Sequence, residues 1–277
     1  MSKPRGSTLG RLAFPAVLGL AVLVFLSGCT AGPKGSASSI TLAGSTSVQP
    51  FAEMLAEEYQ KAYPDRPAVN VQGGGSSAGA RAALSGAAQV GTMSRELGEG
   101  EDELTAVVIA HDAIAVVVNP ANPISGISVE DLKGVFSGEI TDWSQLGGSA
   151  GRISVISREE GSGTRSAFEE LVMKGTVVAK TAVVQDSNGA VRETVAQDEK
   201  AIGYISLGLV DSNVKPLSIG GTRPSVETVK EKSYTLVRPF LFVTKGEMAP
   251  QVKQFVDYVL SPDGQKVLAA EGLVVGN

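Results

Sequence analysis

The chain of 277 residues has little of the side-chain chemistry on which most enzymes depend, because it contains one cysteine and one histidine. A single cysteine excludes an internal disulfide, and one of each leaves no Cys/His cluster that could hold zinc. The sequence also has no G-x-x-x-x-G-K-[ST] loop of the kind that cradles nucleotide phosphates. Disulfide-rich, zinc-dependent and P-loop proteins are therefore excluded, and nothing in the sequence calls for a metal or a cofactor.

The chain also has fewer basic than acidic residues. Lys and Arg number 24 against 29 Asp and Glu, which gives a formal net charge of -5. The first 28 residues contain three basic residues and no acidic one, so the remainder is more acidic still. Nucleic acid is therefore not an expected partner, and a bound anion must be held by local donors against an unfavourable overall field.

Long apolar runs are missing apart from residues 12–26. Basic residues precede this run and small residues follow it, and it is shorter than the roughly 20 residues that cross a membrane. We predict a signal peptide over residues 1–28. The ending LSGC at residues 26–29 resembles the lipobox of bacterial lipoproteins, so Cys29 is the expected lipidated membrane anchor. Residues 29–39, with Gly, Pro and Ser, then form a tether.

The rest of the chain alternates strand-length apolar runs with helical periodicity. Helices are predicted over residues 48–62 and 78–87, each after a short apolar run, which favours an α/β fold with mostly parallel strands. Two longer apolar strands, residues 111–119 and 234–243, indicate two α/β lobes joined by two crossing strands, with a ligand cleft between them. The predicted boundaries are 40–113 for the first lobe, 114–234 for the second, and 235–277 for the return strand and C-terminal helices of the first.

Three predicted helices begin with a loop that combines glycine with hydroxyl residues. The loops read GSTSV at residues 44–48, GSSAG at 75–79 and GSGTR at 161–165. Unpaired N–H groups and the helix dipole attract an anion at such a terminus, glycine allows close approach, and hydroxyls add donors. Serine and threonine are also ordinary N-caps, so one such loop alone would mean little. Arg158 and Arg95 strengthen the anion interpretation, because a guanidinium offers paired donors that match a tetrahedral oxyanion.

The second loop also fits two enzyme motifs. Residues 73–78 satisfy the dinucleotide pattern G-x-G-x-x-G/A, and residues 75–79 satisfy the nucleophile elbow G-x-S-x-G around Ser77. An elbow needs a histidine, and His111 follows Ser77 too closely for the intervening elements of that fold. The dinucleotide pattern has an acidic candidate in Glu96, but it leaves the other two loops unexplained.

The chain resembles the phosphate-binding lipoproteins of bacterial phosphate ABC transporters from about residue 40 to its end. The resemblance is carried, in this order, by AGSTSVQPF, QGGGSSAGA, VGTMSREL, VFSGEITDWSQLGG, SREEGSGTRSAFEE and AIGYISLG. It implies a type II periplasmic-binding-protein fold, in which two lobes close on one phosphate ion that is then passed to a membrane permease. No catalytic residue is expected. The phosphate-binding residues predicted from the loops, the arginines and this resemblance are Ser45, Thr46, Ser47, Ser76, Ser77, Ser94, Arg95, Arg158, Ser162, Gly163 and Thr164.

One departure from that family concerns selectivity. Some members carry an aspartate that accepts the proton of phosphate, whereas the matching region here reads Ser94-Arg95-Glu96. A buried carboxylate would discriminate against sulfate, which has no proton to donate, so its absence predicts weaker discrimination. Glu160, two residues after Arg158, is expected to orient that arginine or to serve as the substitute proton acceptor.

The expected function is capture of inorganic phosphate and its delivery to an ABC transporter permease. We expect a monomer, anchored to the membrane through Cys29, at the extracytoplasmic face of the cell membrane or in the periplasm. The alternatives are a binder of another oxyanion such as sulfate or molybdate, a secreted phosphatase, and an accessory protein without a ligand. The phosphatase lacks a convincing activated nucleophile, and Arg158 with the GSGTR motif argues against loss of the ligand.

Overall fold

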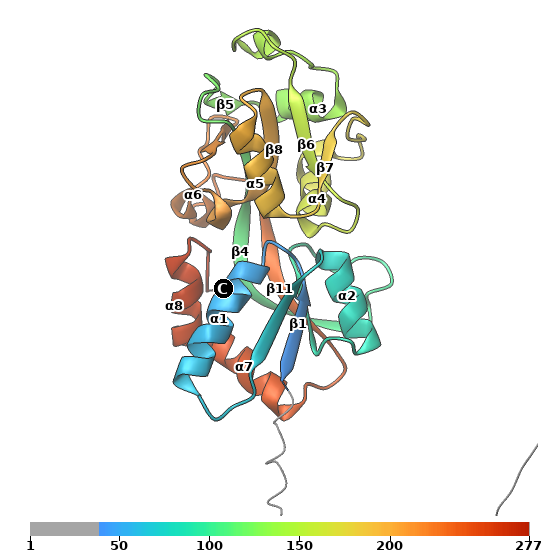
Figure 1. Cartoon of the computed structure of the whole chain (residues 1–277), viewed down its shortest axis with the longest axis vertical. Helices are drawn as coiled ribbons and strands as arrows, with labels where there is room; N and C mark the ends of the chain where they lie inside the picture. Colours follow the sequence, from blue (N-terminus) through green and yellow to red (C-terminus); the bar gives the residue numbers. More distant parts are fainter. Residues whose placement is uncertain (1–38, 277) are drawn as a thin grey trace, which may run out of the picture. The chain divides into compact units, whose positions relative to one another are not determined.

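The computed structural model describes residues 39–276 (Figure 1). The predicted signal peptide and Cys29 lie outside the described residues, as does nearly all of the predicted tether. Within residues 39–276, no helix combines the length and the apolar character needed to cross a membrane.

Strands and helices alternate through most of the described chain. The strands are β1 (Ile40–Gly44), β2 (Val69–Gly73), β3 (Val90–Met93), β4 (Leu104–Val118), β5 (Gly126–Ile127), β6 (Ser154–Arg158), β7 (Val183–Gln185), β8 (Ala201–Ser206), β9 (Lys215–Pro216), β10 (Ser218–Ile219) and β11 (Val237–Lys245). The helices are α1 (Gln49–Ala62), α2 (Ser76–Ser85), α3 (Val129–Ser137), α4 (Gly163–Phe168), α5 (Asn188–Gln197), α6 (Val226–Lys230), α7 (Pro250–Leu260) and α8 (Pro262–Ala270). Short helical turns are η1 (Trp143–Leu146), η2 (Glu169–Met173) and η3 (Leu207–Leu209).

One mixed sheet runs through the described residues in the order β2-β1-β3-β11-β4-β8-β6-β7, with β9 paired to β4. We call the part around β1 to β3 lobe 1 and the part around β6 to β8 lobe 2. Pairing is parallel within β1, β2 and β3 and within β6, β7 and β8. The strands at the centre, β11 and β4, run antiparallel to their neighbours. Parallel strands followed by helices place the helix N-termini at one end of each half-sheet, where ligands bind in open α/β folds.

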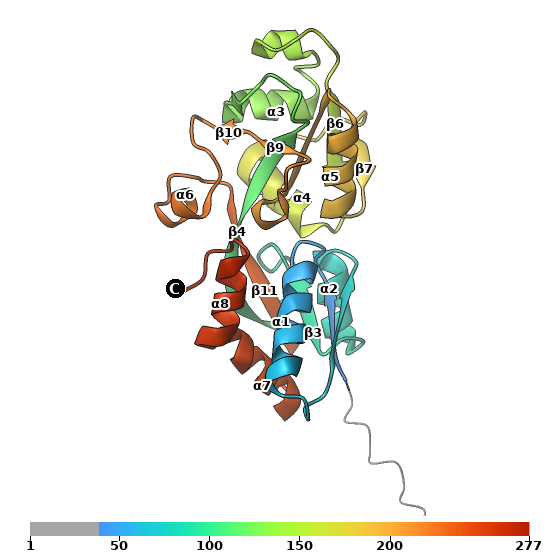
Figure 2. The same ribbon diagram turned by 60° about the vertical axis from the view of Figure 1, so that its left-hand side comes forward.

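Lobe 1 is covered by helices on both faces of its strands. In α1, Phe51, Leu55 and Tyr59 recur every four residues, so they form one buried stripe. This stripe packs with residues of α7, α8 and the central strands in one hydrophobic cluster (Figure 2). The opposite face is covered by α2, whose alanines pack against Leu241 and Val243 of β11. Small residues let α2 approach the sheet closely, which fixes the position of its first residue.

Lobe 2 has the same layered construction around β8. Along β4, Ile114, Val116 and Val118 face the larger cluster with α3, α4 and η2, while Ala115 and Val117 face the cluster beneath α5. This alternation is the ordinary period of a strand that is buried on both faces. The N-termini of α4 and α5 are thereby held on the side of lobe 2 that meets lobe 1.

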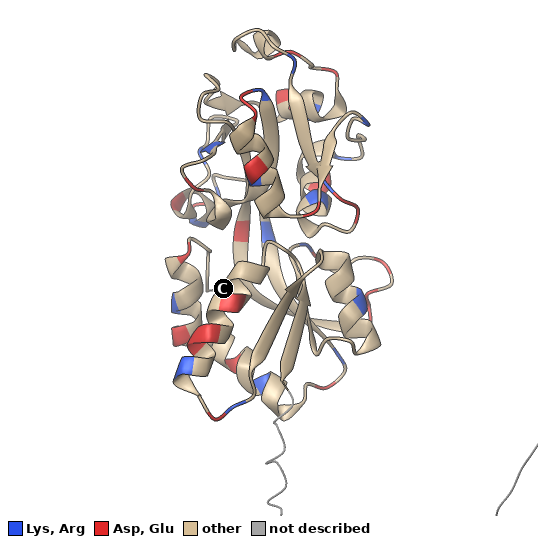
Figure 3. Cartoon of the chain, in the orientation of Figure 1, with Lys and Arg blue, Asp and Glu red and all other residues tan. Residues whose placement is uncertain are grey.

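The two lobes are joined through β4 and β11. β4 pairs with β11 from Leu104 to Ala113 and with β8 from Ile114 to Val118, so it passes from one lobe to the other without a break. Figure 3 shows an acidic and a basic position side by side on these two strands, at the level where the lobes meet. They correspond to the ion pair of Asp112 and Arg238, which is 2.9 Å long.

Candidate anion-binding site

Four helices begin where the two lobes meet, α1 and α2 in lobe 1 and α4 and α5 in lobe 2. The hydroxyls of Ser47, before α1, and Thr164, in α4, lie 2.9 Å apart. The backbone N–H of Ser77 in α2 donates to the carbonyl of Gly161 at 3.0 Å. Helix N-termini carry unpaired N–H groups and a partial positive charge. The arrangement therefore concentrates hydrogen-bond donors for an anion in a protein of negative net charge.

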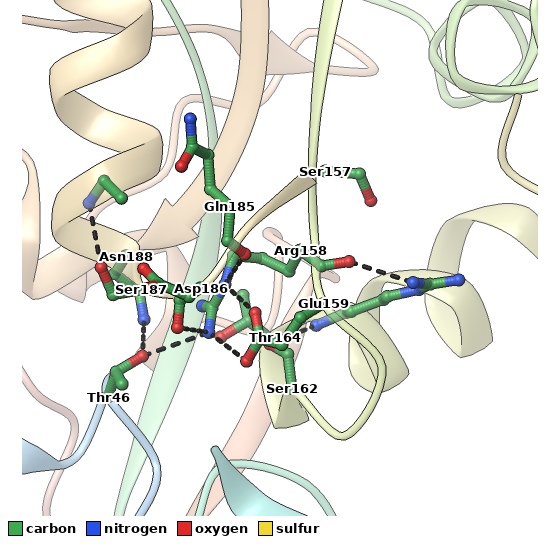
Figure 4. A network of polar contacts seen from close by, with 12 residues as sticks. Thr46, Ser157, Arg158, Glu159, Ser162, Thr164, Gln185, Asp186, Ser187 and Asn188 are labelled. Atoms are coloured by element: carbon green, nitrogen blue, oxygen red, sulfur yellow. Dashed lines mark hydrogen bonds and ion pairs between the residues drawn. The ribbon is translucent and has the colours of Figure 1, made fainter. Parts of the chain in front are cut away.

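Arg158 ends β6 and is 1% exposed. Its Nε and Nη2 donate to the carboxylate of Glu159 at 2.8 and 2.9 Å, and Nη2 also donates to Thr46 Oγ1 at 3.2 Å (Figure 4). Within residues 39–276, Arg158 Nη1 has no hydrogen-bond partner. A buried donor without a partner is costly unless a ligand uses it, and the guanidinium fork matches an oxyanion. Arg158 is therefore the strongest single sign of an anion site.

Two side chains fix the backbone of Arg158. The Tyr204 hydroxyl accepts from Arg158 N at 3.2 Å, and Arg165 Nη1 donates to Arg158 O at 3.0 Å. Burial raises the pKa of Tyr204 to about 12, so this hydroxyl keeps its proton at neutral pH. Phe168 of α4 stacks on the Tyr204 ring of β8 with a centroid separation of 4.2 Å, so the residue that bonds Arg158 N is itself held against α4. The arginine is thus presented from a rigid part of lobe 2.

Three more of the predicted hydroxyls form a buried group on the lobe 1 side. Ser45 Oγ donates to Ser94 Oγ at 2.9 Å, and Ser94 N donates to Ser76 Oγ at 3.0 Å. This group faces α4, because a Cβ atom placed on Gly163 would lie 2.1 Å from Ser76 Oγ and 2.6 Å from Ser94 Oγ. Ser162 caps α4, its Oγ accepting from the backbone N–H of the third helical residue at 3.2 Å. The structure therefore brings these predicted residues to the same lobe boundary.

Arg95 lies in a different environment from Arg158. Its Nη1 and Nη2 donate to the two carboxylate oxygens of Glu101 at 2.8 and 2.7 Å, and Nη2 donates to Ser77 Oγ at 3.2 Å. The guanidinium fork is occupied by Glu101, so this geometry favours a role in holding the loop after β3. The ligand roles of Arg95 and Ser77 stay predictions.

The Arg95 pair makes a testable contribution to stability. Hydrogen bonds from Arg95 hold the pKa of Glu101 below its ordinary value, so this stabilisation is present at neutral pH and is lost as pH falls through the lowered pKa. We expect Glu101→Gln to reduce the free energy of unfolding by about 1–2 kcal/mol at pH 7, as measured by urea denaturation. The gap should begin to narrow below about pH 4, where the carboxylate of the unfolded state takes up its proton, and should close once pH falls below the lowered pKa of the folded state. Exposed Glu96, replaced by Gln, is the matched control and should change little; a Glu101→Gln gap that stays constant with pH would contradict this account.

The carboxylate that pairs with Arg158 belongs to Glu159 and not to Glu160, which was the expected residue. The strand ends at Arg158, and the side chain of Glu159 lies along the guanidinium with both oxygens bonded to it. Glu160 is exposed in the turn that follows. The orienting role therefore falls to the adjacent residue, and Glu159 balances the charge of Arg158.

Sequence reasoning missed Asn188, Asp112 and Arg238. Asn188 Nδ2 donates to Thr46 Oγ1 at 3.1 Å and to Ser47 Oγ at 2.9 Å, which makes it part of the boundary. Its signal was available, because Ser187-Asn188-Gly189 opens a helix with the same small polar residues as the three predicted loops. The other two are charged residues inside apolar strands, a pattern that indicates a buried ion pair.

Comparisons with known proteins agree on one family. The model of the PBP superfamily domain matches residues 30–263. The phosphate-binding protein PstS of Bacillus subtilis is 32% identical over 246 residues, which cover 87% of this chain and 81% of that protein. A crystal structure from Clostridium perfringens, assigned as a phosphate ABC transporter substrate-binding protein and containing phosphate, aligns with a TM-score of 0.84 and 37% identity, over 87% of this chain and 100% of that one. An ABC-type phosphate transport receptor from Vibrio cholerae aligns with a TM-score of 0.72 and 36% identity, over 86% of this chain and 100% of that one.

The chain belongs to the phosphate-binding proteins of the PBP superfamily. The family resemblance and the predicted fold class, two α/β lobes joined by crossing strands, are therefore confirmed. Phosphate-binding proteins of this family are extracytoplasmic transport components and not enzymes. The phosphatase alternative is accordingly not favoured.

Proposed function

We propose that this protein captures inorganic phosphate outside the cytoplasm and delivers it to the permease of an ABC transporter. The observation that carries the proposal is the buried Nη1 of Arg158, which has no partner among residues 39–276 and lies where four helix N-termini meet. Such donors suit an oxyanion. The phosphate-binding relatives and the phosphate-containing neighbour support inorganic phosphate as that ion.

Capture depends on closure of the lobes. The bonds from Ser77 N to Gly161 O and from Asn188 to Ser47 join lobe 1 to lobe 2, so they exist only when the lobes are closed. A phosphate ion that accepts hydrogen bonds from both lobes binds the closed state better and shifts the population toward it. The permease would then meet a closed, loaded protein.

The membrane arrangement forms part of the proposal. We infer that acylated Cys29 anchors a monomer to the membrane and that residues 29–39 tether the lobes near the permease. The support is the LSGC ending after a basic and apolar leader, together with an extracytoplasmic family. Charge is consistent with this arrangement, because the acidic body would not be drawn to an anionic lipid surface and needs a covalent anchor.

Calorimetric titration of the purified protein tests the proposed ligand. We expect one phosphate ion per chain at neutral pH, with binding that survives a large excess of sulfate. Discrimination requires an acceptor-only group at the ion, because a hydroxyl can donate to sulfate as readily as it accepts from phosphate. The carboxylate of Glu159, which lies against Arg158, is the group that would accept the proton of phosphate, and sulfate has none to donate. Equal binding of phosphate and sulfate would show that the site recognises the charge and shape of the ion but not its proton. Absence of phosphate binding would overturn the proposal.

A further inference from the structure

We propose that Asn188 is a positioning residue that couples closure of the lobes to phosphate capture by setting the direction of the Thr46 and Ser47 hydroxyls. This inference rests on the phosphate-binding function proposed above. Asn188 begins α5 in lobe 2, whereas Thr46 and Ser47 lie between β1 and α1 in lobe 1. Figure 4 shows Asn188 facing Thr46 across this boundary, from the same side as Arg158.

The hydrogen bonds that the Thr46 and Ser47 hydroxyls accept leave each of them only its hydrogen to offer. A hydroxyl has one hydrogen to donate and two lone pairs to accept. Thr46 Oγ1 accepts from Asn188 Nδ2 at 3.1 Å and from Arg158 Nη2 at 3.2 Å. Ser47 Oγ accepts from Asn188 Nδ2 at 2.9 Å and from Arg238 Nη2 at 3.0 Å. Because both acceptor positions on each oxygen are filled, each O–H must act as a donor. The O–H of Ser47 donates to Thr164 Oγ1 at 2.9 Å, which leaves the hydrogen of Thr164 to donate to the ion.

A hydrogen bond to the oxygen of the Asn188 amide fixes the orientation of its nitrogen. Its Oδ1 accepts from the backbone N–H of Ser206 at 3.1 Å, so the Nδ2 group must face lobe 1. Ser206 Oγ donates to Asp112 Oδ1 at 2.9 Å, and Asp112 Oδ2 accepts from Arg238 Nη2 at 2.9 Å. Arg238 in turn donates to Ser47, which closes a circuit of hydrogen bonds.

This circuit is buried, and its members come from both lobes and from the two crossing strands. Its five members are at most 2% exposed, and they are Ser47, Asp112, Asn188, Ser206 and Arg238. Asp112 and Arg238 lie on the crossing strands β4 and β11, Ser47 lies in lobe 1, and the other two lie in lobe 2. Buried polar networks of this kind act as units, and a fully satisfied one specifies a single arrangement. Closure therefore completes the circuit and turns the Thr46 and Ser47 hydroxyls into donors in the same step.

A reversal of polarity at residue 188 separates this role from simple packing. Asn188→Asp keeps the shape and the acceptor toward Ser206, but it replaces the donor with a carboxylate oxygen that would accept the hydrogens of Thr46 and Ser47. We expect calorimetry at pH 7 to show phosphate binding weakened about 30-fold by Asn188→Asp and about 5-fold by Asn188→Ala. The matched control is Asn122→Asp, at a lobe 2 asparagine that is 4% exposed and bonded to Glu199 O and Ile124 N. It should leave phosphate affinity within about twofold, because those partners lie in lobe 2 alone.

The outcomes distinguish the two proposals. Equal losses for Asn188→Asp and Asn188→Ala, or wild-type affinity in both, would overturn the positioning role, because that role depends on the polarity of the side chain. Melting temperatures of the ligand-free variants, compared with that of Asn122→Asp, show whether a loss of binding comes from unfolding. If the wild type itself fails to bind phosphate, both the proposed function and this inference are wrong.

Discussion

Replacement of Arg158 by methionine is expected to weaken phosphate binding by about 300-fold or more. The change removes the buried charge and the Nη1 donor that has no partner within residues 39–276. Truncating one partner of a buried, hydrogen-bonded charge pair costs about 2–5 kcal/mol, and about 3.4 kcal/mol corresponds to this factor. Isothermal calorimetry with phosphate measures the loss directly. Arg192→Met is the control, since that arginine is also in lobe 2 but its side chain is 37% exposed and pairs with Asp211.

A second variant identifies the origin of the loss. Arg158→Met leaves the carboxylate of Glu159 without its partner, and that charge alone could repel phosphate. The double variant Arg158→Met/Glu159→Gln removes the unpaired charge as well. If the donors of Arg158 bind the ion, the double variant stays at least about 100-fold weaker than the wild type. Recovery to near wild-type affinity would mean that Arg158 serves only to neutralise Glu159, and the assignment of the site would be wrong.

The helix-start loops could be found from the sequence because their requirements are local. Gly75 and Gly161 have φ near +87°, a backbone conformation that glycine adopts without strain, and hydroxyl residues follow each of them. The helix predicted over residues 48–62 is observed at Gln49–Ala62, and the one predicted over 78–87 is observed at Ser76–Ser85. Capping residues and periodicity are thus sufficient to locate the helix ends to within about two residues.

The crossing strands and the hydrogen-bond circuit were harder to predict because their partners are distant in sequence. The strand expected at residues 111–119 is observed as β4, Leu104–Val118, since exposed positions in its first half hide its apolar pattern. Arg238 meets Asp112 across 126 residues and Ser47 across 191. Asn188 meets Ser47 across 141 residues. A charge inside an apolar strand indicates that a partner exists, but only the fold says which residue it is.

Gly163 leads to a prediction that separates closure from folding. Its φ lies outside the left-handed region and it begins α4, so alanine suits the local backbone and has the higher helix propensity. A Cβ atom there would nevertheless lie 2.1 Å from Ser76 Oγ and 2.6 Å from Ser94 Oγ. Both serines are 0% exposed and belong to lobe 1, so they have little room to withdraw. The contact is relieved when the lobes separate, which leaves each lobe able to fold.

We therefore expect Gly163→Ala to weaken phosphate binding by about 100-fold, which corresponds to the upper end of the roughly 1–3 kcal/mol cost of overpacking. The melting temperature of the ligand-free protein should stay at or above that of the wild type. Small-angle scattering should show that phosphate compacts the wild type and not the variant. Gly189→Ala is the matched control, because Gly189 lies in the first turn of α5 and a Cβ atom there would approach nothing closer than Ser187 Oγ at 4.0 Å. Unchanged affinity in Gly163→Ala would mean that Ser76 and Ser94 turn away without loss, and so that their hydroxyls do not contribute to binding in the closed state.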